Sequence, residues 1–167
     1  MKTRKRNQNG FTLIEVIVTL VLVGITAVLA GMWIVSVANG YLFAKENAGN
    51  VQKGQLAMTR LTKEFTAIQS VDSSVTTATQ ITYTRADALD SLVSATVSST
   101  GGVLQLNGDI LTDGVSAFTL AYCNDDVTAP SCSTTWSPTT SRIIEITLKL
   151  TGAESMPFTK RIAPRNL

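Results

Sequence analysis

The hydrophobic positions of this 167-residue chain follow three successive patterns. Residues 11–38 are almost continuously apolar, and this run contains a single acid, Glu15. Charged residues then appear, while apolar side chains keep the three-and-four spacing of an amphipathic helix. They are Val51, Met58, Leu61, Phe65 and Ile68. From residue 80 onward the apolar period changes to two, which is typical of strands. The pattern predicts one long helix followed by a β domain.

The first part of the predicted helix is long enough to cross a membrane. Its 28 residues, 11–38, would extend about 42 Å at 1.5 Å per residue, against a hydrocarbon core of roughly 30 Å. The helix is expected to continue as an amphipathic segment over residues 39–71, because Ser, Thr and Asp become frequent after residue 70. Gly54 falls on the apolar stripe and costs about 1 kcal/mol in a helix interior, so we expect the backbone of a partner to approach it closely.

Alternation of period two marks the strands of residues 72–167. The clearest signal is Asn107-Gly108 between two apolar runs, because both residues tolerate the positive φ of a hairpin turn. Other alternating apolar positions are Ile81 and Tyr83; Phe118, Leu120 and Tyr122; Ile144, Ile146, Leu148 and Leu150; and a last short strand over Phe158–Ile162. A long helix followed by strands predicts an α+β fold, in which the helix stripe covers an antiparallel sheet.

The composition excludes several functional classes. The chain has no histidine, which removes Ser-His-Asp and Cys-His nucleophilic sites and the commonest metal ligand. We therefore expect no enzyme and no cofactor. Four of the fourteen basic residues lie within the first ten residues, so the remainder carries ten basic and twelve acidic residues, a net charge of −2. That charge gives no footprint for nucleic acid.

Cys123 and Cys132 are the only cysteines, and they lie after the apolar helix. A disulfide is the natural interpretation if this part of the chain is exported, and it would stabilise the fold by roughly 2.5–3 kcal/mol in the chain-entropy model. Two reduced thiols are the alternative; a zinc site would have only half its ligands. Beside Cys123, the run Asn124-Asp125-Asp126 could supply oxygens to calcium, although such runs are more often solvated turns.

The N-terminus combines a basic leader, a Gly10-Phe11 junction and Thr12-Leu13-Ile14-Glu15 at the start of the apolar helix. This arrangement resembles the class III signal of type IV pilins and type II secretion pseudopilins. The resemblance implies that a prepilin peptidase cuts after Gly10 and N-methylates Phe11. It also implies that Glu15 neutralises the terminal ammonium of a neighbouring subunit during filament assembly. A lone carboxylate in a membrane helix costs about 2.5–3.5 kcal/mol on insertion scales, so a partner is needed.

Two other interpretations of the N-terminus remain. The first is a secretory signal peptide with Val28-Leu29-Ala30 as its cleavage site before Gly31, although the apolar run is about twice the usual length. The second is a plain single-pass anchor. Neither has a use for Glu15. In all three, the leader charges would hold the N-terminus in the cytoplasm.

The resemblance implies a pilin fold in four parts: a leader over 1–10, a membrane and assembly helix over 11–38, its amphipathic continuation over 39–71, and a periplasmic β domain over 72–167. The expected location is the bacterial inner membrane, with possible incorporation into a pilus or pseudopilus. The expected partners are prepilin peptidase, other pilins or pseudopilins, and the inner-membrane assembly platform. The resemblance leaves open whether the system is type II secretion, a type IV pilus or competence.

Shorter motifs in the C-terminal half resemble the J-type minor pseudopilins and the W-type minor pilins. They are Leu111-Thr112-Asp113-Gly114-Val115, the strand Ile143-Ile144-Glu145-Ile146-Thr147-Leu148, and the ending Arg165-Asn166. Major pilins usually carry a helix-kinking proline about where Met32 stands, and its absence favours a minor subunit that initiates or caps a filament. The alternative is a pilin-like adhesin or DNA-uptake subunit, but Lys160, Arg161 and Arg165 alone are thin support for DNA binding.

Overall fold

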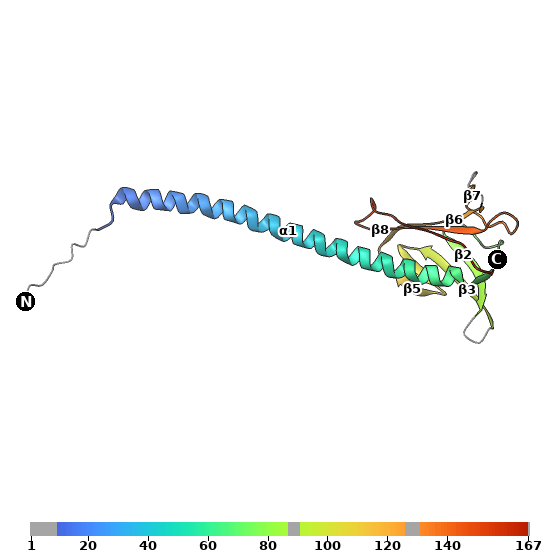
Figure 1. Cartoon of the computed structure of the whole chain (residues 1–167). Coiled ribbons are helices and arrows are strands. Elements are labelled where there is room, and N and C mark those ends of the chain that lie inside the picture. Colours follow the sequence, from blue (N-terminus) through green and yellow to red (C-terminus); the bar gives the residue numbers. More distant parts are fainter. Residues whose placement is uncertain (1–9, 87–90, 126–130, 167) are drawn as a thin grey trace, which may run out of the picture. The chain divides into compact units, whose positions relative to one another are not determined.

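The computed structural model describes residues 10–86, 91–125 and 131–166. The chain divides into two compact units, residues 1–45 and 46–167. Helix α1 runs from Leu13 to Thr66, so its N-terminal part belongs to the first unit and its C-terminal part to the second (Figure 1). Antiparallel strands and the turns that connect them follow the helix in the second unit. This is the α+β, pilin-like architecture that the sequence predicts.

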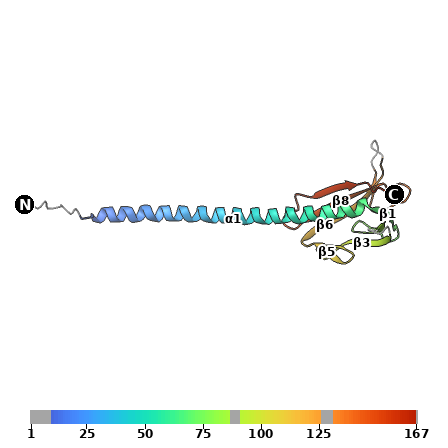
Figure 2. The ribbon, with the colours of Figure 1, turned by 60° about the horizontal axis from the view of Figure 1, so that its bottom comes forward.

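The strands form two antiparallel sheets. The first has the order β1-β2-β3-β4-β5, and the second has the order β7-β6-β8-β9. In sequence order the strands are β1 (Ile68–Val71), β2 (Gln80–Ala86), β3 (Leu92–Thr100), β4 (Val103–Leu106), β5 (Asp109–Thr112), β6 (Val115–Cys123), β7 (Cys132–Ser133), β8 (Ile143–Leu150) and β9 (Phe158–Ile162). In Figure 2 β8 is drawn on one side of the C-terminal part of α1, and β3 and β5 are drawn on the other.

The predicted hairpin is confirmed between β4 and β5. Asn107 and Gly108 occupy the turn with φ values of 55° and 88°, the positive φ at both central residues that the favoured two-residue hairpin turn requires. The alternation predicted for Ile144–Leu150 is also confirmed, because every second residue of β8 is buried. Strand β9 has the predicted bounds, Phe158–Ile162.

The helix ends earlier than the sequence pattern indicates. It stops at Thr66 rather than near residue 71, and Ile68–Val71 form strand β1. Ile68 is fully buried, as its place in the apolar stripe predicts. However, it is buried as part of strand β1, which pairs with β2, and not as part of the helix. The spacing of Phe65 and Ile68 fits a helix and a turn into a strand equally well. Val51, at the other end of the predicted stripe, is exposed.

One hydrophobic core joins α1 to both sheets. The helix contributes Ala57, Met58, Leu61 and Phe65 to the core, and the ring of Phe65 meets that of Tyr83 edge-to-face with centroids 5.6 Å apart. The remaining members are Ile68, Ile81, Ala95, Val97, Leu104, Leu106, Val115, Phe118, Leu120, Tyr122, Trp136, Ile144, Ile146, Leu148, Leu150 and Ile162.

Gly54 is buried at the point where α1 passes β9. A Cβ atom at this position would lie 2.4 Å from Cε2 of Phe158, so only glycine leaves room for the ring. The close approach expected from the sequence is therefore real, but the neighbour is an aromatic side chain. Polar contacts at the helix surface add to this docking: Asn50 Nδ2 donates to the Thr151 carbonyl at 3.2 Å, and Lys53 Nζ lies 2.6 Å from Asp113 Oδ1.

Candidate functional site

The predicted processing site lies immediately before the helix. Gly10, Phe11 and Thr12 are non-helical and exposed, and α1 begins at Leu13. A protease needs an accessible bond in a chain that can be drawn out of regular structure, and the Gly10–Phe11 bond meets both conditions. No atom would crowd a Cβ placed on Gly10 within 4 Å among the described residues. The geometry thus leaves the bond open to a peptidase.

Thr12 caps the helix and places Glu15 in its first turn. The Glu15 backbone N–H donates to Thr12 Oγ1 at 3.4 Å, and the Val16 N–H donates to the Thr12 carbonyl at 3.2 Å. Thr12 and Glu15 thus stand at the N-cap and N3 positions of a capping-box sequence, and the helix dipole favours an acid there. Helix capping alone would therefore give Glu15 a modest stabilising role. This is an alternative explanation to the role in filament assembly that the resemblance implies.

The Glu15 carboxylate is exposed and has no side-chain partner among the residues that the structure describes. Every residue from Gly10 to Lys45 is exposed, so this part of the helix presents a mainly apolar surface. Glu15 is the only acid on that surface. In lipid such a carboxylate would be costly without a cation beside it. Within the described part of this chain, no cation neutralises the Glu15 carboxylate.

The described residues contain one helix long and apolar enough to cross a membrane, α1. Two threonine hydroxyls within its apolar part are satisfied by backbone carbonyls of the helix. Thr19 Oγ1 donates to the Val16 carbonyl at 2.9 Å, and Thr26 Oγ1 donates to the Leu22 carbonyl at 3.0 Å. Backbone-bonded hydroxyls of this kind are compatible with lipid, where an unsatisfied donor costs several kcal/mol.

The two cysteines form a disulfide. Cys123 ends β6 and Cys132 begins β7, and the two residues face each other in register between these strands. The neighbouring Tyr122 packs edge-to-face against Trp136 with ring centroids 5.8 Å apart, so both sides of the loop are tied to the core. Sequence reasoning did not identify Trp136 as a core residue, because it stands alone in a Ser/Thr-rich loop without apolar periodicity.

The calcium candidate beside the disulfide finds no support in the described residues. Asn124 Oδ1 accepts a hydrogen bond from the Ser131 N–H at 2.9 Å, so it closes the loop. Asp125 ends the described stretch, and Asp126 lies outside the described residues. No group of three or more potential ligands is found among His, Cys, Asp and Glu side chains of the described ranges. Asn124 acts here as a turn residue, as such runs commonly do.

A buried ionic cluster, which the sequence did not reveal, joins α1 to β2. The Glu64 carboxylate is 4% exposed and lies 2.9 Å from Arg60 Nη2 and 2.8 Å from Arg85 Nε. Tyr83 Oη donates to Glu64 Oε2 at 3.2 Å, whereas the Arg85 contact lacks hydrogen-bond geometry and is an ion pair. Burial, followed by the Glu64 charge, raises the pKa of Tyr83 well above its usual range. The phenol therefore stays protonated and remains a donor to Glu64.

The basic residues considered for DNA binding do not form a common cluster of free charges. Arg161 is paired with Glu145 across β8 and β9. Lys160 and Arg165 instead line a cavity with α1. The basic patch is thus reduced to two residues on the C-terminal segment, too few to track a nucleic-acid backbone.

Comparison with known proteins agrees with the N-terminal interpretation. Residues 5–31 match the family model described as Prokaryotic N-terminal methylation motif. No curated protein matches the chain. The motif is the signal of type IV pilins and pseudopilins, whose members are structural proteins, and it indicates a pilin-like substrate of a prepilin peptidase. The chain therefore combines this motif and an apolar, anchor-like N-terminal helix with a disulfide-linked, pilin-like α+β fold.

Proposed function

We propose that this protein is a minor pilin or pseudopilin subunit, processed at Gly10–Phe11 and incorporated into a filament through α1. The observation that carries the proposal is the exposed Glu15 carboxylate in the first turn of an apolar helix, within the matched motif, which has no counter-charge among the described residues. The N-terminal segment thus has a matched motif, an accessible Gly10–Phe11 bond and, in Glu15, a charge that needs a partner.

Processing would create the partner charge. Hydrolysis of the Gly10–Phe11 amide by water leaves a carboxylate on the leader and an ammonium on Phe11. N-methylation by the same peptidase would take a methyl group from a sulfonium-type donor onto the deprotonated amine, which regains a proton to give a methylated ammonium. The new ammonium lies four residues before Glu15 and outside the helix. Each charge alone is costly in lipid, and pairing it with the opposite charge of a neighbouring subunit removes most of that cost. Docking at a filament base would thus be favoured over staying alone in the bilayer.

The topology follows from the same segment. Residues 1–10 would be the cytoplasmic leader and 11–38 the inner-membrane helix, held in this orientation by the leader charges. The disulfide supports placing residues 46–167 in the oxidising periplasm, since such bonds rarely persist in the cytosol. The partners would be prepilin peptidase, sibling pilins or pseudopilins, and an assembly platform.

A minor role is the finer part of the proposal. Helix α1 is assigned as helical without interruption from Leu13 to Thr66 and has no proline, including at Met32 where major pilins usually carry one. The motif at Leu111–Val115 resembles J-type and W-type minor subunits, and Asp113 within it docks the β5–β6 turn onto α1 through Lys53. These observations favour a subunit that starts or caps a filament.

The experiment compares Glu15→Gln with Thr12→Ala in the native host. Glutamine retains the capping-box pattern but removes the charge, whereas Thr12→Ala removes the cap hydrogen bond and retains the charge. We expect Glu15→Gln to insert normally into membranes yet to disappear from the sheared filament or pseudopilus fraction. Thr12→Ala should retain assembly. Equal behaviour of the two variants would show that Glu15 serves the helix cap alone and would refute the assembly role.

A further inference from the structure

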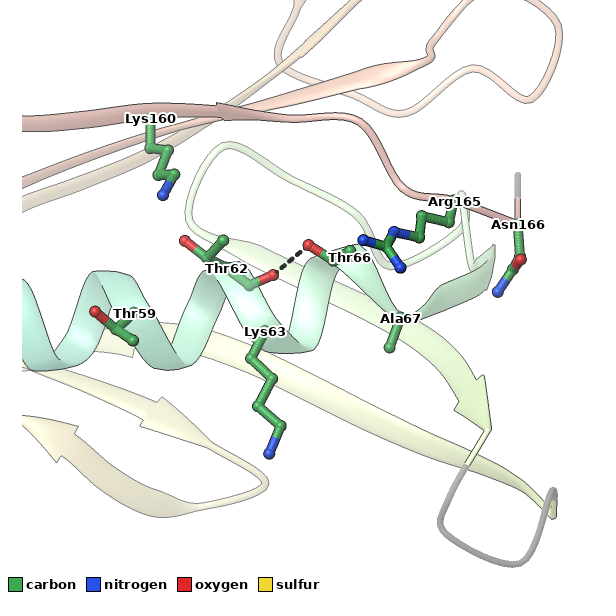
Figure 3. A pocket seen from close by; sticks show the side chains of 8 residues that line it. All are labelled: Thr59, Thr62, Lys63, Thr66, Ala67, Lys160, Arg165 and Asn166. Atoms are coloured by element: carbon green, nitrogen blue, oxygen red, sulfur yellow. Dashed lines mark hydrogen bonds between the residues drawn. The ribbon is translucent and has the colours of Figure 1, made fainter.

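A groove runs between α1 and β9, on the 46–167 unit. It consists of two adjoining cavities of about 540 Å³ and 300 Å³, which share Thr59 and Lys160. The larger cavity is lined by the end of α1 with Ala67, by Lys160 of β9, and by Arg165 and Asn166 after β9. The smaller cavity is lined by α1 and by the first three residues of β9. We call this feature the α1–β9 groove; Figure 3 shows the side chains of its larger part.

Strand β9 is an open edge of its sheet. It pairs with β8 and is the last strand in the order β7-β6-β8-β9. In the described part of the chain, no backbone hydrogen bond joins β9 to any element other than β8. An unpaired edge of this kind is a template for an added strand, and natural proteins usually block it with charge, proline or a covering element.

The groove carries positive charge without compensation. In Figure 3 Lys160 projects from β9 toward Thr62, and the Arg165 guanidinium lies beside Thr66, while Lys63 extends from the opposite side of the helix. None of these three cations forms an ion pair with any residue that the structure describes, and no acid lines either cavity. Two nearby arginines, by contrast, do form ion pairs: Arg60 with Glu64 and Arg161 with Glu145.

The helix wall is small and polar. Thr59, Thr62 and Thr66 donate their hydroxyl protons to backbone carbonyls of α1, at 2.7, 2.6 and 2.7 Å respectively. Because these side chains are short, they leave space in the groove. Their hydroxyl protons already bond to the helix backbone and are not available to a ligand. Among the described residues, the donors that an incoming group could meet therefore include the cationic side chains, the amides of Gln55 and Asn166, and the unpaired N–H groups of the β9 edge.

We propose that the α1–β9 groove binds an extended, acidic segment of a partner protein, which adds to β9 as a further strand. The wall from Gln55 to Thr66 measures about 16 Å along the helix, the length of about five extended residues. Alternate side chains of the added strand would face α1, where carboxylates would meet Lys160 and Arg165. Phe158 against Gly54 bounds one end, and the Arg165 N–H bond to the Thr66 carbonyl bounds the other. This inference does not rest on N-terminal processing.

The test measures binding to the full chain in detergent micelles by fluorescence anisotropy. The probe is a labelled peptide of about eight residues with alternating Glu and Val, a length that spans the groove. The comparison probes are the matching Lys–Val peptide, the Glu–Val peptide with a central proline, and a single-stranded DNA oligonucleotide. We expect saturable binding of the Glu–Val peptide alone, weakened by salt. Equal binding of the proline peptide would overturn strand addition, since proline cannot donate to a ladder.

Variants locate the site. The double substitution Lys160→Glu and Arg165→Glu should weaken Glu–Val binding about tenfold or more, because two favourable charge contacts become repulsive. Lys149→Glu is the matched control: it lies on β8, on the face opposite the buried residues, and should change binding by less than about twofold. Far-UV circular dichroism verifies that both variants fold. Absence of binding, tighter binding of the oligonucleotide, or equal loss in the control would each refute the proposal.

Discussion

At Gly54, substitution by alanine should destabilise the protein, although Gly→Ala normally stabilises a helix. In an open helix, Gly→Ala stabilises by about 1 kcal/mol through backbone propensity. At Gly54 the added Cβ would lie 2.4, 2.5 and 2.8 Å from three ring atoms of Phe158, distances at which the ring must move. The ring is held by the pairing of β9 with β8, in which Phe158 faces Leu148.

The magnitude follows from these two opposing effects. Overpacking a filled site costs typically 1–3 kcal/mol, so Gly54→Ala should lower the free energy of unfolding by up to about 2 kcal/mol after the propensity gain. In a Phe158→Leu background the two nearest ring atoms, Cε2 and Cζ, are absent, and the shorter leucine side chain can rotate its Cδ atoms away from the added Cβ. There, Gly54→Ala should raise the free energy of unfolding by about 1 kcal/mol.

The assay is urea unfolding of the full chain in mild detergent, followed by the fluorescence of Trp136. A Trp33→Phe background makes Trp136 the only tryptophan, and its burial ensures a signal from the folded domain. Gly49→Ala is the matched control: among the described residues a Cβ there meets nothing within 4 Å, so the substitution should stabilise. The reasoning fails if Gly54→Ala and Gly49→Ala behave alike, or if Phe158→Leu leaves the sign unchanged.

Three further predictions concern the 46–167 unit. Glu64→Ala should destabilise by about 3 kcal/mol in the same urea assay, because it leaves the partly buried Arg85 without a counter-charge; a loss below about 1 kcal/mol would contradict the buried cluster. Cys132→Ser should lower the thermal midpoint without abolishing the fold, and two alkylatable thiols in wild-type protein isolated from its native host would show that the bridge is absent. The hydrogen bond from Lys53 holds the pKa of Asp113 below its usual 3.8, so this contact stabilises above that pH and its contribution is lost as the pH falls through the lowered pKa. Lys53→Met should accordingly weaken the acid dependence of the thermal midpoint, and an unchanged acid limb would rule this contact out.

Patterns with local causes could be predicted from the sequence. Asn107-Gly108 specifies its own turn, and the alternation of Ile144–Leu150 follows from a strand with one buried face. The long apolar helix and the methylation motif are likewise encoded within one segment. The prediction of one antiparallel sheet was correct in kind, although the strands divide into two sheets that share a core.

Features that depend on tertiary partners could not be predicted. Strand β3 is rich in Ser and Thr, and only Ala95 and Val97 are buried in it, so its own pattern is weak. Glu64 reads as a solvated helix residue until β2 places Arg85 beside it. The end of the helix is fixed by the pairing of β1 with β2, not by a local stop signal such as glycine or proline.

The most direct test of the account is the N-terminal residue of the protein extracted from the membranes of its native host. Intact mass and N-terminal sequencing together identify both the cut and any added methyl group. The account predicts a chain that begins at Phe11 and carries one methyl group on its amine, with Glu15 five residues into the mature protein. A chain that begins at Gly31, or one that retains Met1 and the basic leader, would contradict it.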